Sequence, residues 1–172
     1  MSLATFSFPT TTLFGAGALA ELPKRLVALG IQRPLVVTDP GLLSTEAFQL
    51  LNQTLGPKKQ GKTWFLYFGV HANPIEQDVQ EAAQAFRAHD CDGIIAVGGG
   101  SALDVGKAAR LLVRRPGFAL AKFYDQPDWS DLATFVAIPT TAGTGSEVGR
   151  SSVITLGAKK RKSVIFHPQL VE

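Results

Sequence analysis

Short apolar runs alternate with segments of helical periodicity along most of the chain. Four runs are apolar at nearly every position and are bounded by Gly, Pro, Asp or Asn, at residues 35–38, 64–68, 94–97 and 135–138. Runs of this length and continuity are typical of parallel strands that are covered on both faces of a sheet. The pattern therefore predicts four buried strands.

The segments between these runs have apolar residues at helical spacing. The first carries leucines at positions 19, 22, 26 and 29, and Gly30 follows as a helix stop. The second carries apolar residues at positions 48, 51 and 55 and ends at Gly56. Ser44 lies before it and is expected to cap its N-terminus.

Two further helices are expected. Asn73 and Pro74 can start the third, with Asn73 as cap and Pro74 in the first turn, and the apolar residues at 75, 79, 82 and 86 then share one face. Residues 101–113 have the pattern of the fourth. Strands that alternate with helices indicate βαβ units, so we predict an α/β fold with a doubly wound, mostly parallel, Rossmann-like sheet.

Both ends of the chain have the pattern of peripheral β-hairpins. Residues 5–8 and 11–14 flank Pro9 and Thr10 near the N-terminus. Residues 152–156 and 163–166 flank Gly157 and a basic run at 159–162 near the C-terminus. A basic run this short is usually a solvated turn, which is how we interpret it.

The composition narrows the possible classes of function. Of the 172 residues, 45% are hydrophobic and 18% are charged, which is enough apolar material for a core. The net charge of +3 is not gathered on a sustained basic face, so no nucleic-acid binding is expected. The chain has no apolar run of membrane-helix length and no signal-peptide pattern at its N-terminus. Cys91 is the lone cysteine, is expected to be buried, and fits a cytoplasmic protein.

The run at 94–97 leads into three glycines and a helix. Gly98, Gly99 and Gly100 lack the side chains that would keep a pyrophosphate away from the backbone. A helix that starts at Ser101 offers free N–H groups and the positive end of its dipole to an anion. Ser101 and Asp104 also have the spacing of a capping box, and a tight structural turn is the alternative interpretation. Because three consecutive glycines carry a large cost in conformational entropy, phosphate binding is favoured.

A second loop of small and hydroxyl-bearing residues follows the run at 135–138. It spans residues 139–147 and carries Thr140, Thr141, Thr144 and Ser146. This composition suits recognition of anions or hydroxyl groups, and a solvated loop has the same composition. Ligands of open α/β sheets bind outside the carboxyl ends of the strands, so two such loops at strand ends together indicate a ligand site.

Asp39 ends the run at 35–38. A carboxylate there can accept hydrogen bonds from a ribose diol and would repel the 2′-phosphate of NADP; an ordinary turn aspartate before Pro40 is the alternative. Gly15 and Gly17 match the dinucleotide-binding pattern G-x-G-x-x-A, with Asp39 about 20 residues further on. That motif requires a buried strand before it, and residues 10–14 are too polar, so we assign both glycines to a turn into the first helix.

Together these segments resemble the iron-containing alcohol dehydrogenases, with their glycerol dehydrogenase and dehydroquinate synthase relatives. The matches occur in family order and cover essentially the whole chain: FGAG at 14–17, VTDPG at 37–41, NP at 73–74, GGGS at 98–101 with Asp104 and Lys107, and PTTAGTGSE at 139–147. The last of these is the most specific. Gly149 stands where the family commonly has threonine, so the loop is expected to differ there.

The resemblance implies that the chain binds NAD, or NADP, and it implies roles for individual residues. Asp39 would meet the adenosine ribose. The pyrophosphate would be held by Gly98, Gly99, Gly100 and Ser101. The adenine and ribose side would be lined by Thr140, Thr141 and Thr144. The cofactor or its nicotinamide end would be bordered by Asn73, Asp104, Ser146 and Lys162.

The resemblance also implies a second, all-helical domain that binds the metal through one aspartate and three histidines. This chain has only His71, His89 and His167, and none has the spacing of a ligand pair. We interpret His71 as a loop residue and His167 as a strand end. Residues 1–172 are therefore expected to form a dinucleotide-binding domain with no catalytic residue, no Fe²⁺ site and no helical domain.

The implied activity is reversible hydride transfer between a nicotinamide cofactor and a small alcohol or aldehyde, with this chain as the cofactor-binding half and inactive alone. One alternative is a stand-alone dinucleotide-binding module without catalysis. Another is a lyase of the dehydroquinate synthase type, which the loop at 140–147 disfavours. Exposed strand edges and uncovered apolar surface also predict a homodimer or a larger assembly.

Overall fold

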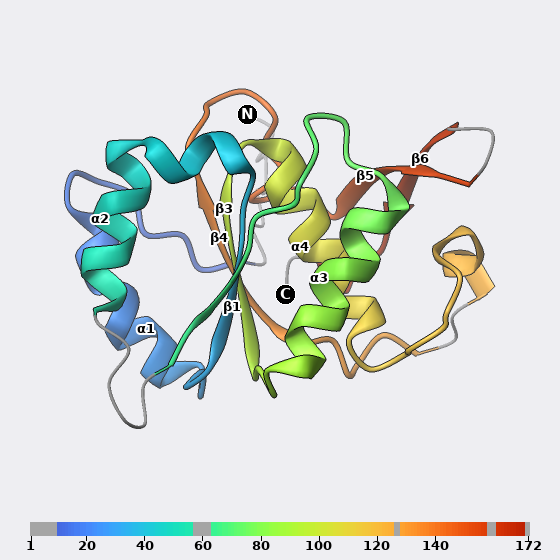
Figure 1. The fold of residues 1–172 in the computed structure, drawn as a ribbon, viewed down its shortest axis with the longest axis horizontal. Coiled ribbons are helices and arrows are strands. Elements are labelled where there is room, and N and C mark those ends of the chain that lie inside the picture. The colour runs from blue at the N-terminus through green and yellow to red at the C-terminus, as the bar shows by residue number, and fades with distance from the viewer. Residues whose placement is uncertain (1–9, 57–62, 126–127, 158–160, 171–172) are drawn as a thin grey trace, which may run out of the picture.

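The computed structural model describes residues 10–56, 63–125, 128–157 and 161–170. Within these ranges no helix is long and apolar enough to cross a membrane. Helices and strands alternate as far as β4, and β5 and β6 then follow with no helix between the strands (Figure 1). The order is η1 (Ala18–Glu21), α1 (Leu22–Ala28), β1 (Pro34–Val37), η2 (Pro40–Ser44), α2 (Glu46–Leu55), β2 (Phe65–Tyr67), α3 (Glu76–Ala88), β3 (Gly93–Gly98), α4 (Gly100–Leu112), η3 (Leu120–Asp125), β4 (Thr134–Pro139), β5 (Ser151–Leu156), β6 (Arg161–Phe166) and η4 (Pro168–Leu170).

Four parallel strands form the main sheet, in the order β2-β1-β3-β4. The register pairs Leu35 of β1 with Phe65 on one side and with Ile94 on the other. The chain winds outward from β1 in one direction and then returns to continue in the other. The sheet is therefore doubly wound, as predicted, and its topological switch point lies between β1 and β3.

The two faces of the sheet are covered by different helices. Figure 1 shows α1 and α2 on one side and α3 and α4 on the other. Successive strand side chains point to opposite faces. Val36 and Ile95 pack in the core under α1 and α2, whereas Leu35 and Ile94 pack in the core under α3 and α4. Because both faces of β1 and β3 are buried, their sequences are apolar at successive positions.

The predicted C-terminal hairpin is present as a separate antiparallel sheet of β5 and β6. Its inward side chains Ile154 and Ile165 are fully buried in the core that α3 and α4 share. The interpretation of the basic run as a turn is wrong for Arg161 and Lys162, which begin β6. Pairing with β5 makes these two residues part of a strand. The remainder of the run lies outside the described residues.

The predicted N-terminal hairpin is not present where the structure describes this segment. Residues 11–14 are exposed and form no strand, and residues 5–8 lie outside the described part of the chain. Phe14 is fully exposed, so the alternation of polar and apolar residues here marks no buried face. Gly17 has a φ of 80° and precedes η1, as expected for a turn into the first helix.

Two helices begin later than predicted. Ser44 is not the cap of α2, because the 3₁₀ turn that starts at Pro40 continues through it. Thr45 caps the helix instead, and its Oγ1 accepts a hydrogen bond from the backbone N–H of Phe48 (3.3 Å). Asn73 is not the cap of α3, which begins after Ile75.

Candidate functional site

The three glycines at the junction of β3 and α4 form a floor without side chains at the carboxyl edge of the sheet. Gly98 has a φ of 142°, a conformation that favours glycine. A Cβ at Gly98 would lie 2.9 Å from Ala102 Cβ and 3.3 Å from Asp39 Oδ2, and one at Gly100 would lie 2.9 Å from Thr144 Cγ2. At Gly98 and Gly100, glycine is thus favoured by the close approach of the surrounding residues. We call residues 98–100 the glycine floor.

Helix α4 points its N-terminus at the glycine floor. Gly99 is its N-cap, and no side chain caps the first turn. The predicted capping box is wrong: Ser101 Oγ donates to the Ala72 carbonyl oxygen (2.8 Å), and Asp104 accepts a hydrogen bond from Ser146 Oγ (2.5 Å). Both side chains tie α4 to other elements, which leaves the first N–H groups of the helix available to an anion.

The hydroxyl-rich loop after β4 lies against the glycine floor. The backbone N–H of Thr140 donates to the Gly98 carbonyl oxygen (2.9 Å). Thr141 Oγ1 lies 3.5 Å from the position that a Cβ on Gly99 would take. Thr140, Thr141 and Thr144 are exposed, whereas Ser146 is buried. The loop and the floor therefore form one continuous surface at neighbouring strand ends.

Asp39 borders the floor from the end of β1. Its Oδ1 accepts a hydrogen bond from the backbone N–H of Leu42 (3.2 Å), which makes it the cap of η2. Its Oδ2 faces Gly98 and accepts no hydrogen bond from the described residues. The carboxylate thus has the turn role that the sequence allowed, and it also presents a free oxygen beside the floor.

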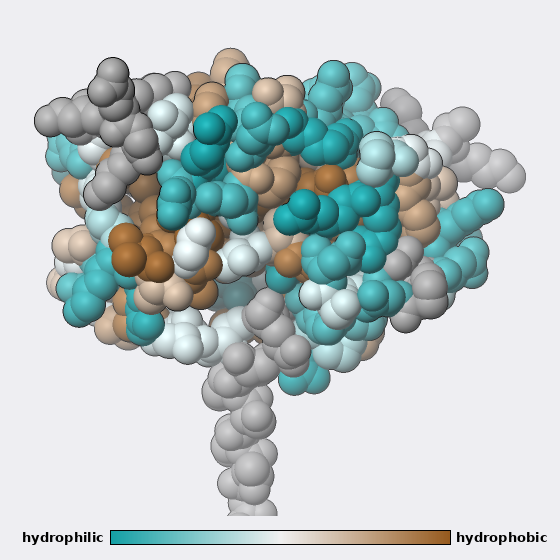
Figure 2. Space-filling view, turned by 90° about the horizontal axis from the view of Figure 1, so that it is seen from below, coloured by the Kyte–Doolittle hydropathy of each residue, from teal (hydrophilic) through white to brown (hydrophobic). Residues whose placement is uncertain are grey.

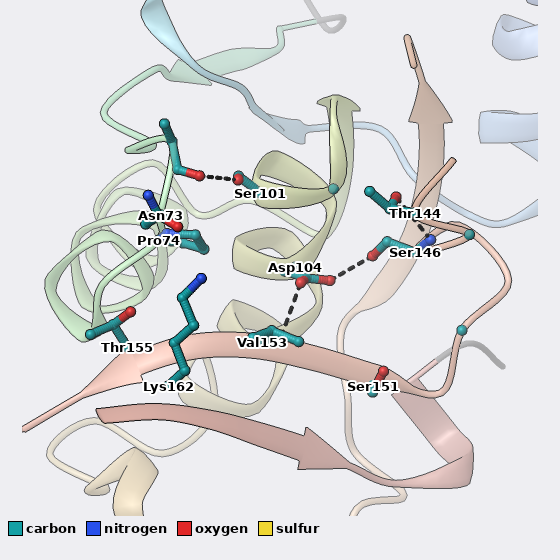
Figure 3. Close-up of a pocket in the computed structure, with 14 residues that line it drawn as sticks. Asn73, Pro74, Ser101, Asp104, Thr144, Ser146, Ser151, Val153, Thr155 and Lys162 are labelled. Atoms are coloured by element: carbon teal, nitrogen blue, oxygen red, sulfur yellow. Dashed lines mark hydrogen bonds between the residues drawn. The ribbon is translucent and has the colours of Figure 1, made fainter. Parts of the chain in front are cut away.

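A pocket of about 350 Å³ adjoins the floor and lies between α4, the turn at residues 72–74, and the β5–β6 hairpin (Figure 3). The predicted residues that line it are Asn73, Gly100, Ser101, Asp104, Thr144, Ser146 and Lys162. The other predicted residues lie outside this pocket along the adjoining floor and strand ends: Asp39, Gly98, Gly99, Thr140 and Thr141.

Two polar groups in the pocket have no partner among the described residues. Lys162 points from β6 toward Pro74 and the middle of the pocket (Figure 3), and its ammonium group forms no ion pair in the described part of the chain. The Asn73 amide is exposed and likewise makes no hydrogen bond there. A free cation and a free amide beside open space can bind a polar, anionic ligand.

Lys107, which the sequence presented only as part of the family motif, is central to the site. Its side chain is fully buried, and its Nζ donates to the carbonyl oxygens of Ser146 (2.9 Å), Gly149 (3.2 Å) and Ser151. The Asp104 carboxylate lies 3.4 Å away. Burial lowers the pKa of Lys107, and Asp104 opposes this shift. Lys107 thereby fixes the 146–151 loop to α4; a lysine amid apolar residues of a helix was the signal in the sequence.

The profile of the iron-containing alcohol dehydrogenase family matches residues 9–171. The chain belongs to this family. It is 34% identical to alcohol dehydrogenase 4 of Schizosaccharomyces pombe over 96% of the chain, and 29% identical to the NAD-dependent methanol dehydrogenase of Bacillus methanolicus over 98% of the chain. Its fold matches the crystal structure of sulfoacetaldehyde reductase from Bifidobacterium kashiwanohense in complex with NAD+, with a TM-score of 0.84, 28% identity and 99% of the chain covered.

The chain spans about two-fifths of the length of these family members. It covers 39% of the S. pombe relative, 44% of the methanol dehydrogenase and 44% of the sulfoacetaldehyde reductase. The match is therefore to a part of each of these proteins, and this part includes the parallel sheet of the present chain.

The iron site that the family name implies does not fit the described residues of this family member. They contain no group of three His, Cys, Asp or Glu side chains that could hold a metal ion. His71 is a loop residue, as predicted, and its Nδ1 lies 2.7 Å from Asp78 Oδ1. His167 follows β6, as predicted, and stacks on Trp129 with 4.3 Å between ring centroids.

Proposed function

We propose that residues 1–172 form a domain that binds NAD at the carboxyl edge of the parallel sheet. The observation that carries the proposal is the glycine floor beneath the uncapped N-terminus of α4. Backbone N–H groups and a helix dipole that face a surface without side chains suit a pyrophosphate. The family relationship supports the same ligand, because the B. methanolicus relative is an NAD-dependent dehydrogenase.

The geometry suggests how the dinucleotide lies. Gly98, Gly99, Gly100 and Ser101 hold the pyrophosphate. Asp39 accepts hydrogen bonds from the adenosine ribose through its free oxygen. The adenine and ribose side is lined by Thr140, Thr141 and Thr144, and the nicotinamide end is bordered by Asn73, Asp104, Ser146 and Lys162. The pocket adjoins the glycine floor, and both include Gly100, so one dinucleotide can extend across the two.

The whole protein is proposed to catalyse reversible hydride transfer between NAD and a small alcohol or aldehyde. The chain contributes the cofactor site, and we assign no catalytic residue and no metal ligand to it. Without the rest of the family's length it is expected to be inactive. The free, buried thiol of Cys91 is compatible with a reducing, cytoplasmic location, which we also propose.

Cofactor choice tests the proposed site. A carboxylate beside the floor repels the 2′-phosphate of NADP, so calorimetric titration is expected to give tighter binding for NAD than for NADP. Asp39→Asn keeps an acceptor for the Leu42 N–H but removes the charge. It should reduce the difference in affinity between NAD and NADP, and Asp39→Gly should do the same. NADP binding that equals or exceeds NAD binding would overturn the assignment of Asp39. Failure of both cofactors to bind would overturn the proposed function.

We also propose that the chain associates into a homodimer or a larger species. Exposed apolar residues of α1, α2 and the segments that flank α1 support this: Leu13, Phe14, Val27, Leu29 and Leu50. Figure 2 shows apolar surface on the side of the molecule where α1 and α2 lie. Sizeable apolar patches on a protein surface promote association.

A further inference from the structure

One buried carboxylate holds both ends of the turn that carries Asn73. Asp78 lies in the first turn of α3 and is 1% exposed. Its Oδ2 accepts hydrogen bonds from the backbone N–H groups of His71 (3.1 Å) and Ile75 (3.2 Å), and its Oδ1 lies 2.7 Å from His71 Nδ1. The turn at residues 71–75 is therefore closed by a single side chain.

Capping of α3 explains only part of this arrangement. A cap needs the bond to Ile75, which is the residue before the helix. The two contacts with His71 satisfy no helix N–H group, because His71 lies on the far side of the turn. They bring the start of the turn back to its end, and Asn73 lies halfway between the two.

Two other elements fix the rest of the turn. The Ala72 carbonyl oxygen accepts a hydrogen bond from Ser101 Oγ (2.8 Å), and the Pro74 carbonyl oxygen accepts one from the Thr155 N–H (2.8 Å). Each residue of the turn except Asn73 is thus bound to α3, α4 or β5. Asn73 lies at the pocket wall (Figure 3), and its amide makes no hydrogen bond to any residue that the structure describes. A group that is held in place before the ligand arrives binds it with a smaller entropic cost.

We propose that Asp78 is a positioning residue that fixes Asn73 for contact with the nicotinamide half of NAD. The inference rests on the proposed function, since it requires NAD in the pocket. Loss of the carboxylate removes the bonds that Asp78 makes at the two ends of the turn, to His71 and to Ile75, and leaves the turn held only by α4 and β5. The expected result is an affinity for NAD that is about tenfold weaker, the equivalent of one oriented hydrogen bond.

Asp78→Asn is the decisive variant, since it keeps the shape of the side chain but turns one acceptor oxygen into a donor that faces N–H groups. Glu81→Gln is the matched control, because it makes the same chemical change on an exposed residue of α3 that does not contact the turn. NAD affinity is measured by calorimetry for both, for Asn73→Ala, and for Asn73→Ala combined with Asp78→Asn. Hydrogen exchange reports on the amides of residues 71–75.

For Asp78→Asn we expect faster hydrogen exchange in the turn and weaker NAD binding. For Glu81→Gln we expect no change in either quantity. Adding Asp78→Asn to Asn73→Ala should cause no further loss of NAD affinity. If Asp78 only stabilised the fold, Asp78→Asn would weaken NAD binding equally in the wild-type chain and in Asn73→Ala. That result would overturn the proposal. Unchanged NAD affinity in Asp78→Asn would overturn it as well. If the wild-type chain does not bind NAD, it is the proposed function that fails.

His71→Ala keeps the test decisive if Asp78→Asn does not fold. It removes only the ring contact of an exposed histidine, whose side chain is 66% exposed, and it keeps the backbone bonds. A loss of NAD affinity of about two- to threefold is expected, from one weakened hydrogen bond, and this loss should disappear in the Asn73→Ala background. An equal loss in both backgrounds contradicts the proposal.

Discussion

Lys107 has no exposed surface, so its charge has to be compensated from within the protein. Three backbone carbonyl oxygens and the Asp104 carboxylate provide this compensation. If the ammonium group is removed, Asp104 loses its cation and the three carbonyl groups lose their donor. Unpaired groups of this kind are costly in a protein interior.

Lys107→Met is therefore expected to lower the free energy of unfolding by roughly 3–5 kcal/mol, the cost of removing one partner of a buried ion pair. Lys122→Met makes the same change at an exposed position and is expected to stay within about 0.5 kcal/mol of wild type. Denaturant titration followed by tryptophan fluorescence measures both. Equal losses for the two variants would contradict the role given to Lys107.

Cys91 is expected to react slowly in the native state. Burial raises the pKa of its thiol from 9.0 to about 12, with smaller opposing and reinforcing effects from Arg33, Asp92 and Asp90. Since only the thiolate reacts, alkylation by iodoacetamide at pH 8 should be more than about tenfold slower than in the unfolded chain. Mass spectrometry of samples with and without denaturant measures the two rates. Similar rates would show that the thiol is not protected.

At the scale of elements, α4 approaches the sheet so closely that Gly106 has no room for a side chain. A Cβ there would lie 2.7 Å from Ala96 Cβ and 3.0 Å from the Phe135 ring. Alanine improves helix propensity by about 1 kcal/mol, but overpacking of a core costs about 1–3 kcal/mol. The Ala96 Cβ cannot move without its backbone, so the packing cost is expected to prevail.

Gly106→Ala should accordingly lower the free energy of unfolding by about 1–2 kcal/mol, despite the better helix former. Gly99→Ala serves as a control for stability, because its Cβ would lie 3.5 Å from the nearest side-chain atom and its φ is −76°. Thermal unfolding of both variants is the measurement. A higher melting temperature for Gly106→Ala would mean that α4 can move away from the sheet.

The strands and the sheet class could be predicted from the sequence because a strand that is buried on both faces is apolar at successive positions. Residues 94–97 are apolar without interruption, and the structure extends this run by one residue at each end to form β3. The glycine floor and the hydroxyl-rich loop were expected near each other, because the carboxyl ends of parallel strands share one edge. The structure brings them into contact, through the bond from Thr140 to Gly98.

Helix caps and the pocket walls could not be predicted in the same way, because they depend on tertiary partners. Ser101 and Asp104 have the spacing of a capping box, but their side chains bond to residues that are distant in sequence. Ser101 Oγ donates to the Ala72 carbonyl oxygen, and Asp104 accepts a hydrogen bond from Ser146 Oγ. The role of Asp78 likewise depends on how His71 folds back onto α3. A periodic pattern contains no information about such partners.

At the scale of the molecule, exposed apolar residues on the α1–α2 side predict self-association. Phe14 is fully exposed and Val27 is 74% exposed. The combined change of Phe14→Ser and Val27→Ser is expected to shift the chain toward the monomer in light scattering. Phe166→Ser removes an exposed aromatic residue on β6 and should have little effect. A monomer at high concentration in the unmodified chain would refute the proposed assembly.

Because Lys107 binds backbone carbonyl oxygens, the backbone path of the 146–151 loop depends little on which side chains the loop carries. Gly149 and Ser151 line the pocket, yet what Lys107 binds at these positions is the carbonyl oxygen that every amino acid carries. A mutation that changes the side chain at 151 therefore keeps the anchoring acceptor. Over evolutionary time, such a loop can acquire new chemistry at the pocket wall while its backbone stays in place, provided that the buried lysine is retained.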